Sequence, residues 1–132
     1  LGTGMFWGVT GGLQYLIPGF LKSYLPFQKI RPLHVSSVVF WIIFSSTGAV
    51  FTYLQQHTGK KIYSQLLIKI QLIIFSLSVI TILISYCAGI FGGREYWEFH
   101  PILALPIVAG WILFLINFIK STSILSDEIF LE

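Results

Sequence analysis

The strongest candidate for a functional residue in this chain is a histidine. His34 lies about one turn inside a predicted helix, and an ionisable side chain at membrane depth is by default a functional candidate. A neutral imidazole at this place could ligate haem iron. The alternative is a buried histidine that hydrogen-bonds a neighbouring helix. His57, in a charged turn, and His100, just before Pro101, are weaker candidates for a ligand.

Two arginines and two glutamates extend this candidate site. Arg31 precedes His34 by about one helical turn, and Arg94, Glu95 and Glu98 lie together in the most polar segment of the chain. Arginine binds carboxylates through a planar fork of donors, so Arg31 and Arg94 would suit two haem propionates. Glu95 and Glu98 are hard oxygen donors that could help hold a calcium ion or pass protons inward. The alternative is an ordinary interfacial loop of mixed charge.

The elements that must position these residues are predicted from the distribution of charge. Only 10% of the 132 residues are charged, whereas a soluble domain carries about 25%. Asp, Glu, Lys and Arg are absent from four runs, each long enough for the roughly 20 apolar residues of a transmembrane helix. These runs cover residues 1–21, 32–59, 70–93 and 99–119. Because lipid offers no hydrogen bonds to the backbone, each span should be helical.

We therefore predict an all-α fold, a polytopic transmembrane bundle of four helices that forms a single domain over residues 1–132. The expected spans are about 1–17, 32–56, 62–91 and 101–120. The first and third connections should share one side of the membrane. The chain starts with Leu1 and its first run is barely one span long, so we expect a fragment of a longer subunit or one chain of a split enzyme.

Charge and cysteine usage exclude several other classes of protein. The net charge of +3 is too sparse for binding nucleic acid. Cys87 is the single cysteine, which excludes an internal disulfide and a CxxC metal site. The basic residues divide evenly between the two predicted sides, so the positive-inside rule gives no orientation.

A stripe of mostly small or polar residues follows one face of the second predicted helix. Its members are His34, Ser37, Trp41, Ser45, Gly48 and Thr52. Steps of three and four residues place these side chains on one face. Small residues in membranes mark faces where helices approach closely. The other interpretation is a face that leaves room for a flat cofactor, and the stripe alone does not choose between the two.

Two segments of the chain resemble a known superfamily. Residues 27–34 (FQKIRPLH) resemble the opening of the second helix in respiratory nitric oxide reductases and cbb-type oxidases, both haem–copper oxidases. Residues 93–99 (GREYWEF) resemble the loop after the third helix, and are more similar to the large, catalytic subunit of the nitric oxide reductases. The match extends through most of the chain, which implies helices one to four of the haem–copper oxidase fold.

This resemblance implies a role for each candidate residue. His34 would be an axial ligand of the low-spin haem b, with Arg31 and Arg94 near its propionates. Glu95 would be a candidate calcium ligand, and Glu98 would belong to a polar region of proton entry. No catalytic residue is expected in this segment, because the high-spin haem and the non-haem iron would lie on later helices.

The resemblance also implies a location and partners. The protein would be a multi-pass protein of the bacterial cytoplasmic (inner) membrane, in contact with lipid. Residues 18–31 and 92–100 would face the periplasm and residues 57–61 the cytoplasm. Electrons would come from a cytochrome c subunit or a quinol, and the remaining helices or a companion chain would complete the enzyme that reduces nitric oxide.

Three alternatives remain open at this point. A cbb-type oxidase that reduces dioxygen is the nearest. A four-helix assembly or structural subunit without haem belongs to another class. A transporter fragment is disfavoured, because no span is interrupted at mid-depth by paired glycine and proline, as transport sites often are.

Overall fold

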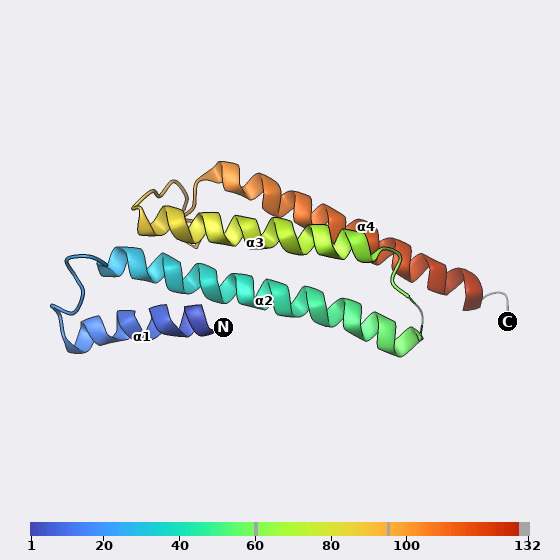
Figure 1. Cartoon of the computed structure of the whole chain (residues 1–132), viewed down its shortest axis with the longest axis horizontal. Helices are drawn as coiled ribbons and strands as arrows, with labels where there is room; N and C mark the ends of the chain where they lie inside the picture. Colours follow the sequence, from blue (N-terminus) through green and yellow to red (C-terminus); the bar gives the residue numbers. More distant parts are fainter. Residues whose placement is uncertain (60, 95, 130–132) are drawn as a thin grey trace.

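The computed structural model describes residues 1–59, 61–94 and 96–129 and is helical through most of that part of the chain. Its elements are α1 (Gly2–Leu16), α2 (Phe27–Thr58), α3 (Gln65–Cys87), the short 3-10 helix η1 (Pro101–Leu103) and α4 (Ala104–Ile129). Successive α-helices run antiparallel, with α1 beside the first half of α2, α3 on the other side of α2 and α4 against α3 (Figure 1). The all-α helix bundle predicted from the sequence is confirmed.

The two connections that carry the candidate site lie at one end of the bundle. The α1–α2 and α3–η1 connections both lie at this end, while α2 ends and α3 begins at the opposite end (Figure 1). The first and third connections therefore lie together at one end of the bundle, as the predicted shared side of the membrane requires.

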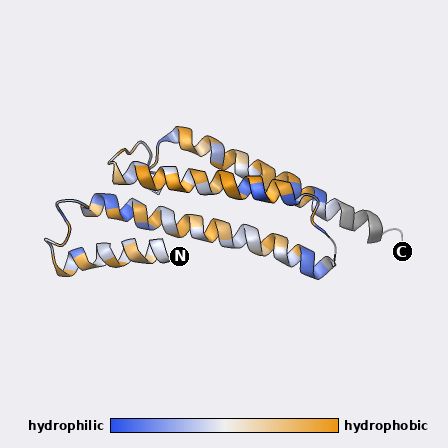
Figure 2. Ribbon diagram, in the orientation of Figure 1, coloured by the Kyte–Doolittle hydropathy of each residue, from blue (hydrophilic) through white to orange (hydrophobic). Residues whose placement is uncertain are grey.

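Three helices are long and apolar enough to cross a membrane. They cover Phe27–His57, Gln65–Cys87 and Pro101–Ser123. The 15 residues of α1 give a length of about 22 Å at 1.5 Å per residue, less than the roughly 30 Å of a hydrocarbon core. Only 17–28% of the most apolar window of each span is buried, so most of these side chains point outward. Figure 2 shows hydrophobic residues along α3 and α4 and more hydrophilic ones near the ends of α2.

The second helix begins five residues before the start predicted at Pro32. Pro26 is the residue before its first turn, and the Pro26 carbonyl accepts the Ile30 amide at 3.2 Å. Pro32 lies inside the helix, where its ring nitrogen cannot donate to the Gln28 carbonyl. Membrane helices tolerate such a proline when neighbours satisfy the backbone. The earlier proline, at Pro26, therefore marks the true start.

The third helix ends at Cys87, not at the predicted residue 91. Gly89 adopts a left-handed φ of 77°. The amides of Gly89 and Ile90 donate to carbonyls of the last helical turn at 3.0 and 2.9 Å. This pattern of two bonds is the Schellman motif, which ends helices at a glycine.

The fourth helical segment begins at Pro101, where it was predicted. The Nδ1 atom of His100 accepts the amide hydrogen of Ile102 at 3.4 Å and so caps η1. α4 then continues to Ile129, past the predicted end at Lys120.

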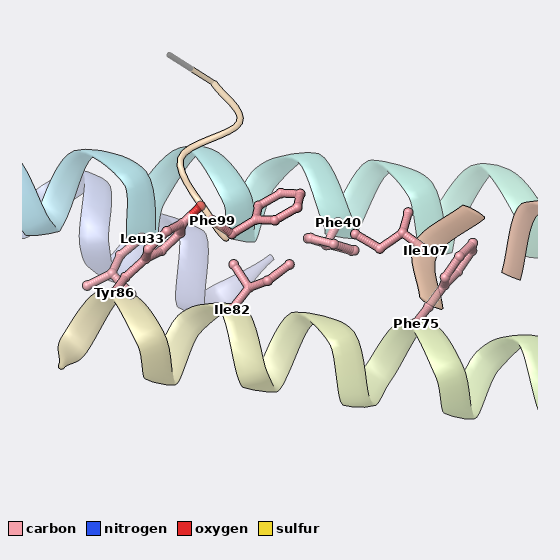
Figure 3. Close-up of a cluster of buried hydrophobic side chains, with 7 residues drawn as sticks. All are labelled: Leu33, Phe40, Phe75, Ile82, Tyr86, Phe99 and Ile107. Atoms are coloured by element: carbon pink, nitrogen blue, oxygen red, sulfur yellow. The ribbon is translucent and has the colours of Figure 1, made fainter. Parts of the chain in front are cut away.

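The buried core joins α2, α3, α4 and the 88–100 connection. Phe99, from that connection, inserts between α2 and α3 (Figure 3). The core residues are Leu33, Phe40, Phe75, Ile82, Tyr86, Phe99 and Ile107. Because Phe99 is anchored here, its neighbour Glu98 is held against the beginning of α2.

A polar cluster fastens α3 to α4 at the other end. Asn117 is fully buried, and its Nδ2 donates to the Ser64 carbonyl at 3.0 Å. The Ser64 amide donates to the Asn117 Oδ1 at 3.1 Å, while the Ser64 hydroxyl accepts from Leu67 and caps α3. Both backbone groups of Ser64 are thus satisfied by one amide side chain.

Candidate functional site

The imidazole of His34 hydrogen-bonds the backbone of α1. Its Nδ1 lies 2.7 Å from the carbonyl oxygen of Gly4, and the residue is half-buried. A carbonyl oxygen only accepts, so Nδ1 carries the proton in this bond. In the neutral ring the proton on Nδ1 leaves the lone pair on Nε2. The tautomer of His34 is therefore the one that presents Nε2 as a ligand.

Three glycines on one face of α1 make room for this contact. A Cβ added to Gly8 would lie 2.8 Å from the Cε1 atom of His34 and 2.9 Å from its Nδ1. Gly4 and Gly11 also face α2 closely, with α2 side-chain atoms 3.0 and 3.1 Å from an added Cβ. These glycines were not predicted as part of the site. Their spacing of four and three was the available signal, because small residues at such spacing mark close helix contacts in membranes.

Arg31 and Glu98 form an ion pair beside the histidine. The Arg31 guanidinium donates to the Glu98 carboxylate. The Glu98 side chain is 13% exposed and that of Arg31 40%. This pair ties the 88–100 connection to α2 about one turn from His34.

The loop that presents Glu98 depends on two glycines. The amides of Gly92 and Gly93 donate to the Glu98 carbonyl at 3.0 and 3.2 Å. A Cβ on Gly93 would overlap the Trp97 carbonyl, so only glycine fits there. The turn is closed by the Trp97 amide, which donates to the Arg94 carbonyl at 2.7 Å.

The predicted site residues are brought together only in part. The structure joins Arg31 and Glu98 directly. Arg94 lies in the same connection with an exposed side chain, where it lines an open hollow with Gly92 and Gly93. Glu95, the predicted calcium candidate, lies outside the described residues.

Two more contacts hold the beginning of α2 to the end of α3. The Lys29 ammonium donates to the Cys87 carbonyl at 3.0 Å. The hydroxyls of Ser36 and Tyr86 lie 3.3 Å apart, and Tyr86 is fully buried. The beginning of α2 is thus held against the end of α3 at these two points, while His34 packs against α1.

The polar stripe on α2 is divided by the length of α1. His34 and Ser37 lie along the part of α2 that α1 covers, and Ser37 is buried. Ser45, Gly48 and Thr52 lie beyond it and are exposed. Close packing against α1 therefore explains the small and polar residues at the beginning of the stripe, but not those further along α2.

The donor set suits one axial haem ligand from this chain. Metal-bound histidines usually donate the other ring N–H to a carbonyl or carboxylate, as His34 does to Gly4. Ser37, one turn further along, buries a hydroxyl with no partner within the described ranges. No group of three or more His, Cys, Asp or Glu side chains occurs in those ranges, so a complete metal site is not formed there.

Comparison with known proteins shows the family to which the chain is related. Residues 1–127 match the model of the family Cytochrome C and Quinol oxidase polypeptide I. The chain is 24% identical over 127 residues to a nitric oxide reductase subunit of Stutzerimonas stutzeri, covering 86% of this chain and 27% of the relative. It is 29% identical over 124 residues to Cytochrome c oxidase subunit 1 homolog of Agrobacterium tumefaciens (strain T37), covering 87% and 23%. The chain spans about a quarter of the length of these curated relatives.

Proposed function

Because this chain belongs to the Cytochrome C and Quinol oxidase polypeptide I family, we propose that it is the low-spin haem b-binding and electron-transfer part of a membrane nitric oxide reductase. Members of this family are oxidoreductases that bind haem. The observation that carries the proposal is the hydrogen bond from Nδ1 of His34 to the Gly4 carbonyl, which leaves the lone pair of Nε2 available to bind a metal.

The residues around His34 supply charge and orientation. Its Nε2 would bind the haem iron, and the Gly4 carbonyl keeps the proton of a neutral ring on Nδ1. When bound, the haem supplies one-electron transfer at a potential set by ligation, burial and nearby charge. Arg31 and Arg94 provide positive charge for the propionates, since a guanidinium has five donors and can bind more than one carboxylate.

Two glutamates complete the proposed site. Glu98, held by Arg31 close to the end of the bundle, takes part in proton uptake from the outer side. Glu95 is proposed as a calcium ligand on the resemblance alone. Calcium takes six to eight oxygen ligands, so most of that site belongs to other parts of the protein.

The complete reaction requires more protein than this segment. The other ligand of the low-spin haem, the high-spin haem and the non-haem iron would lie on later helices of the same subunit or on a companion chain. A cytochrome c subunit or a quinol delivers electrons, and two nitric oxide molecules with two electrons and two protons give nitrous oxide and water. We propose that residues 1–132 form a single domain in the bacterial inner membrane, with residues 18–31 and 92–100 toward the periplasm.

The test is a reduced-minus-oxidised visible spectrum of the complete subunit, purified as wild type, His34→Ala and His57→Ala. His57 is the matched control, because its exposed ring stacks on Tyr53 near the opposite end of α2. We expect the low-spin haem b band in wild type and in His57→Ala, and its loss in His34→Ala. Full low-spin haem in His34→Ala would refute the assignment. A wild-type protein without any haem band would favour the assembly or structural subunit instead.

Dioxygen reduction by a cbb-type oxidase is the second candidate. It is favoured by the relative named Cytochrome c oxidase subunit 1 homolog, which is 29% identical over the matched region. Residues 93–99, which resemble the nitric oxide reductases, favour the first candidate. Rates of nitric oxide and dioxygen consumption by the same purified enzyme, measured with one electron donor, would choose between them.

A further inference from the structure

A pocket lies at the junction of α1 and α2, apart from the histidine site. It has a volume of about 280 Å³ and is lined by Gln14, Tyr15, Pro18, Lys22, Phe27 and Gln28. Pockets for drug-sized ligands have about 300–1,000 Å³, so this one suits a small headgroup better than a whole cofactor.

The walls of the pocket are built by specific contacts. The Nε2 of Gln14 donates to the carbonyls of Phe20 and Leu25 at 3.0 and 2.8 Å, which folds the 17–26 connection against α1. The rings of Tyr15 and Phe27 meet edge to face, with centroids 5.5 Å apart. The pocket is therefore formed by the chain's own packing before any ligand enters.

The position of the pocket corresponds to a membrane interface. Tyr15 is 76% exposed and Tyr24, in the same connection, 81%. At the same end of the bundle, Tyr96 and Trp97 of the 88–100 connection are also exposed. Tyrosine and tryptophan are enriched at the level of lipid headgroups, so a molecule in this pocket would lie among those headgroups.

The charge at the pocket is positive, and no ion pair of Lys22 occurs among the residues that the structure describes. Lys22 is exposed and is the charged member of the lining. All five acidic residues of the chain follow residue 94. Among the described acidic side chains at this end, Glu98 is paired with Arg31. The site therefore combines the Lys22 ammonium, the Gln28 amide and two aromatic rings, a chemistry that fits an anion with an apolar body.

We propose that this pocket binds the phosphate headgroup of an anionic phospholipid. Lys22 provides the charge, the Gln28 amide donates to phosphate oxygens, and the rings of Tyr15 and Phe27 contact the glycerol and first methylenes. A neutral quinol would gain no charge–charge attraction from the Lys22 ammonium. The proposal rests on the placement of this end at a membrane interface and is independent of haem binding by His34.

The test is native mass spectrometry of the complete, delipidated subunit with dioleoyl phosphatidylglycerol, and dioleoyl phosphatidylcholine for comparison. The variants are Lys22→Gln, Lys22→Arg, Gln28→Trp, which fills the pocket without changing charge, and the matched control Lys61→Gln near the opposite end. We expect Lys22→Gln to bind phosphatidylglycerol about fivefold more weakly, which corresponds to about 1 kcal/mol for one basic residue. Gln28→Trp should also bind more weakly, while Lys22→Arg and Lys61→Gln should match wild type.

Each other outcome overturns the proposal. Equal losses in Lys22→Gln and Lys61→Gln would indicate surface charge alone, and no loss in Gln28→Trp would exclude the pocket. Displacement of the lipid by millimolar inorganic phosphate would indicate a site for free phosphate. Displacement by a short-chain quinol would indicate a quinol pocket. Loss of haem from His34→Ala would leave all of these results unchanged.

Discussion

Replacement of Gly8 by alanine is predicted to disturb the candidate haem ligand without touching its side chain. The added Cβ would lie 2.8 Å from the Cε1 of His34, whereas ordinary contact begins at 3.4 Å. The ring or α1 must therefore move by 3.4 minus 2.8 Å, about 0.6 Å. A shift of that size strains the 2.7 Å bond from Nδ1 to the Gly4 carbonyl.

The expected stability change follows from two opposing effects, and the expected change in metal affinity from a third. Overpacking costs about 1–3 kcal/mol. Alanine in place of glycine stabilises a helix by about 1 kcal/mol. The net effect is therefore a destabilisation of about 0–2 kcal/mol. Loss of the partner that orients a metal-bound histidine typically lowers metal affinity about 10–100-fold. Haem retention is therefore the more sensitive readout than stability.

Gly12→Ala is the matched control for this prediction. It adds the same methyl group to the same helix, but no atom outside α1 lies within 4 Å of the new Cβ. Haem content per subunit and the midpoint potential, measured by redox titration of the visible spectrum, should be unchanged in Gly12→Ala and altered in Gly8→Ala. If both variants retain haem with the wild-type potential, the contact between α1 and His34 has no part in positioning a ligand.

Three further predictions concern the packing that supports the site. Asn117→Ala leaves the amide and carbonyl of Ser64 unpaired and should cost about 2–4 kcal/mol in the free energy of unfolding, measured in detergent by denaturant titration; an unchanged midpoint would contradict this. A double-mutant cycle of Arg31→Gln and Glu98→Gln should give a coupling of about 0.5–1 kcal/mol, because the Arg31 side chain is 40% exposed, and a coupling of zero would mean that the pair does not fasten the loop. Gly93→Ala should open the 88–100 connection and speed its cleavage by an added protease, and equal cleavage rates would refute the backbone overlap.

The helix bundle was predictable because apolar, charge-free runs of this length are typical of membrane-spanning helices and rare in soluble domains. Helix boundaries were less predictable because the chain offers competing signals at each end. Both Pro26 and Pro32 suit the start of a helix, and the structure uses the earlier one. Both Gly89 and the pair Gly92-Gly93 suit an end, and the helix ends at the first glycine that can adopt a left-handed conformation.

The candidate site was predictable in its side chains and not in its backbone contacts. His34, Arg31 and Glu98 are polar residues in apolar surroundings, which made them visible in the sequence. The hydrogen-bond partner of His34 is a backbone carbonyl oxygen. Because every residue has a carbonyl oxygen, the sequence could not show which residue provides it. The glycines at 4, 8 and 11 were the indirect signal, and Gly8 in particular marks where the imidazole lies.

The contacts around His34 differ in how easily they can be replaced. The beginning of α2 is linked to α3 and the 88–100 connection by Lys29, Arg31 and Ser36, so loss of one link leaves two others. Toward α1 the ring has a single hydrogen bond, and its place depends on the absence of a side chain at Gly8. Catalytic and cofactor-binding groups need their geometry held within about half an ångström by their supporting contacts. The structure therefore locates the sensitivity of this site in α1, the helix without a single charged residue.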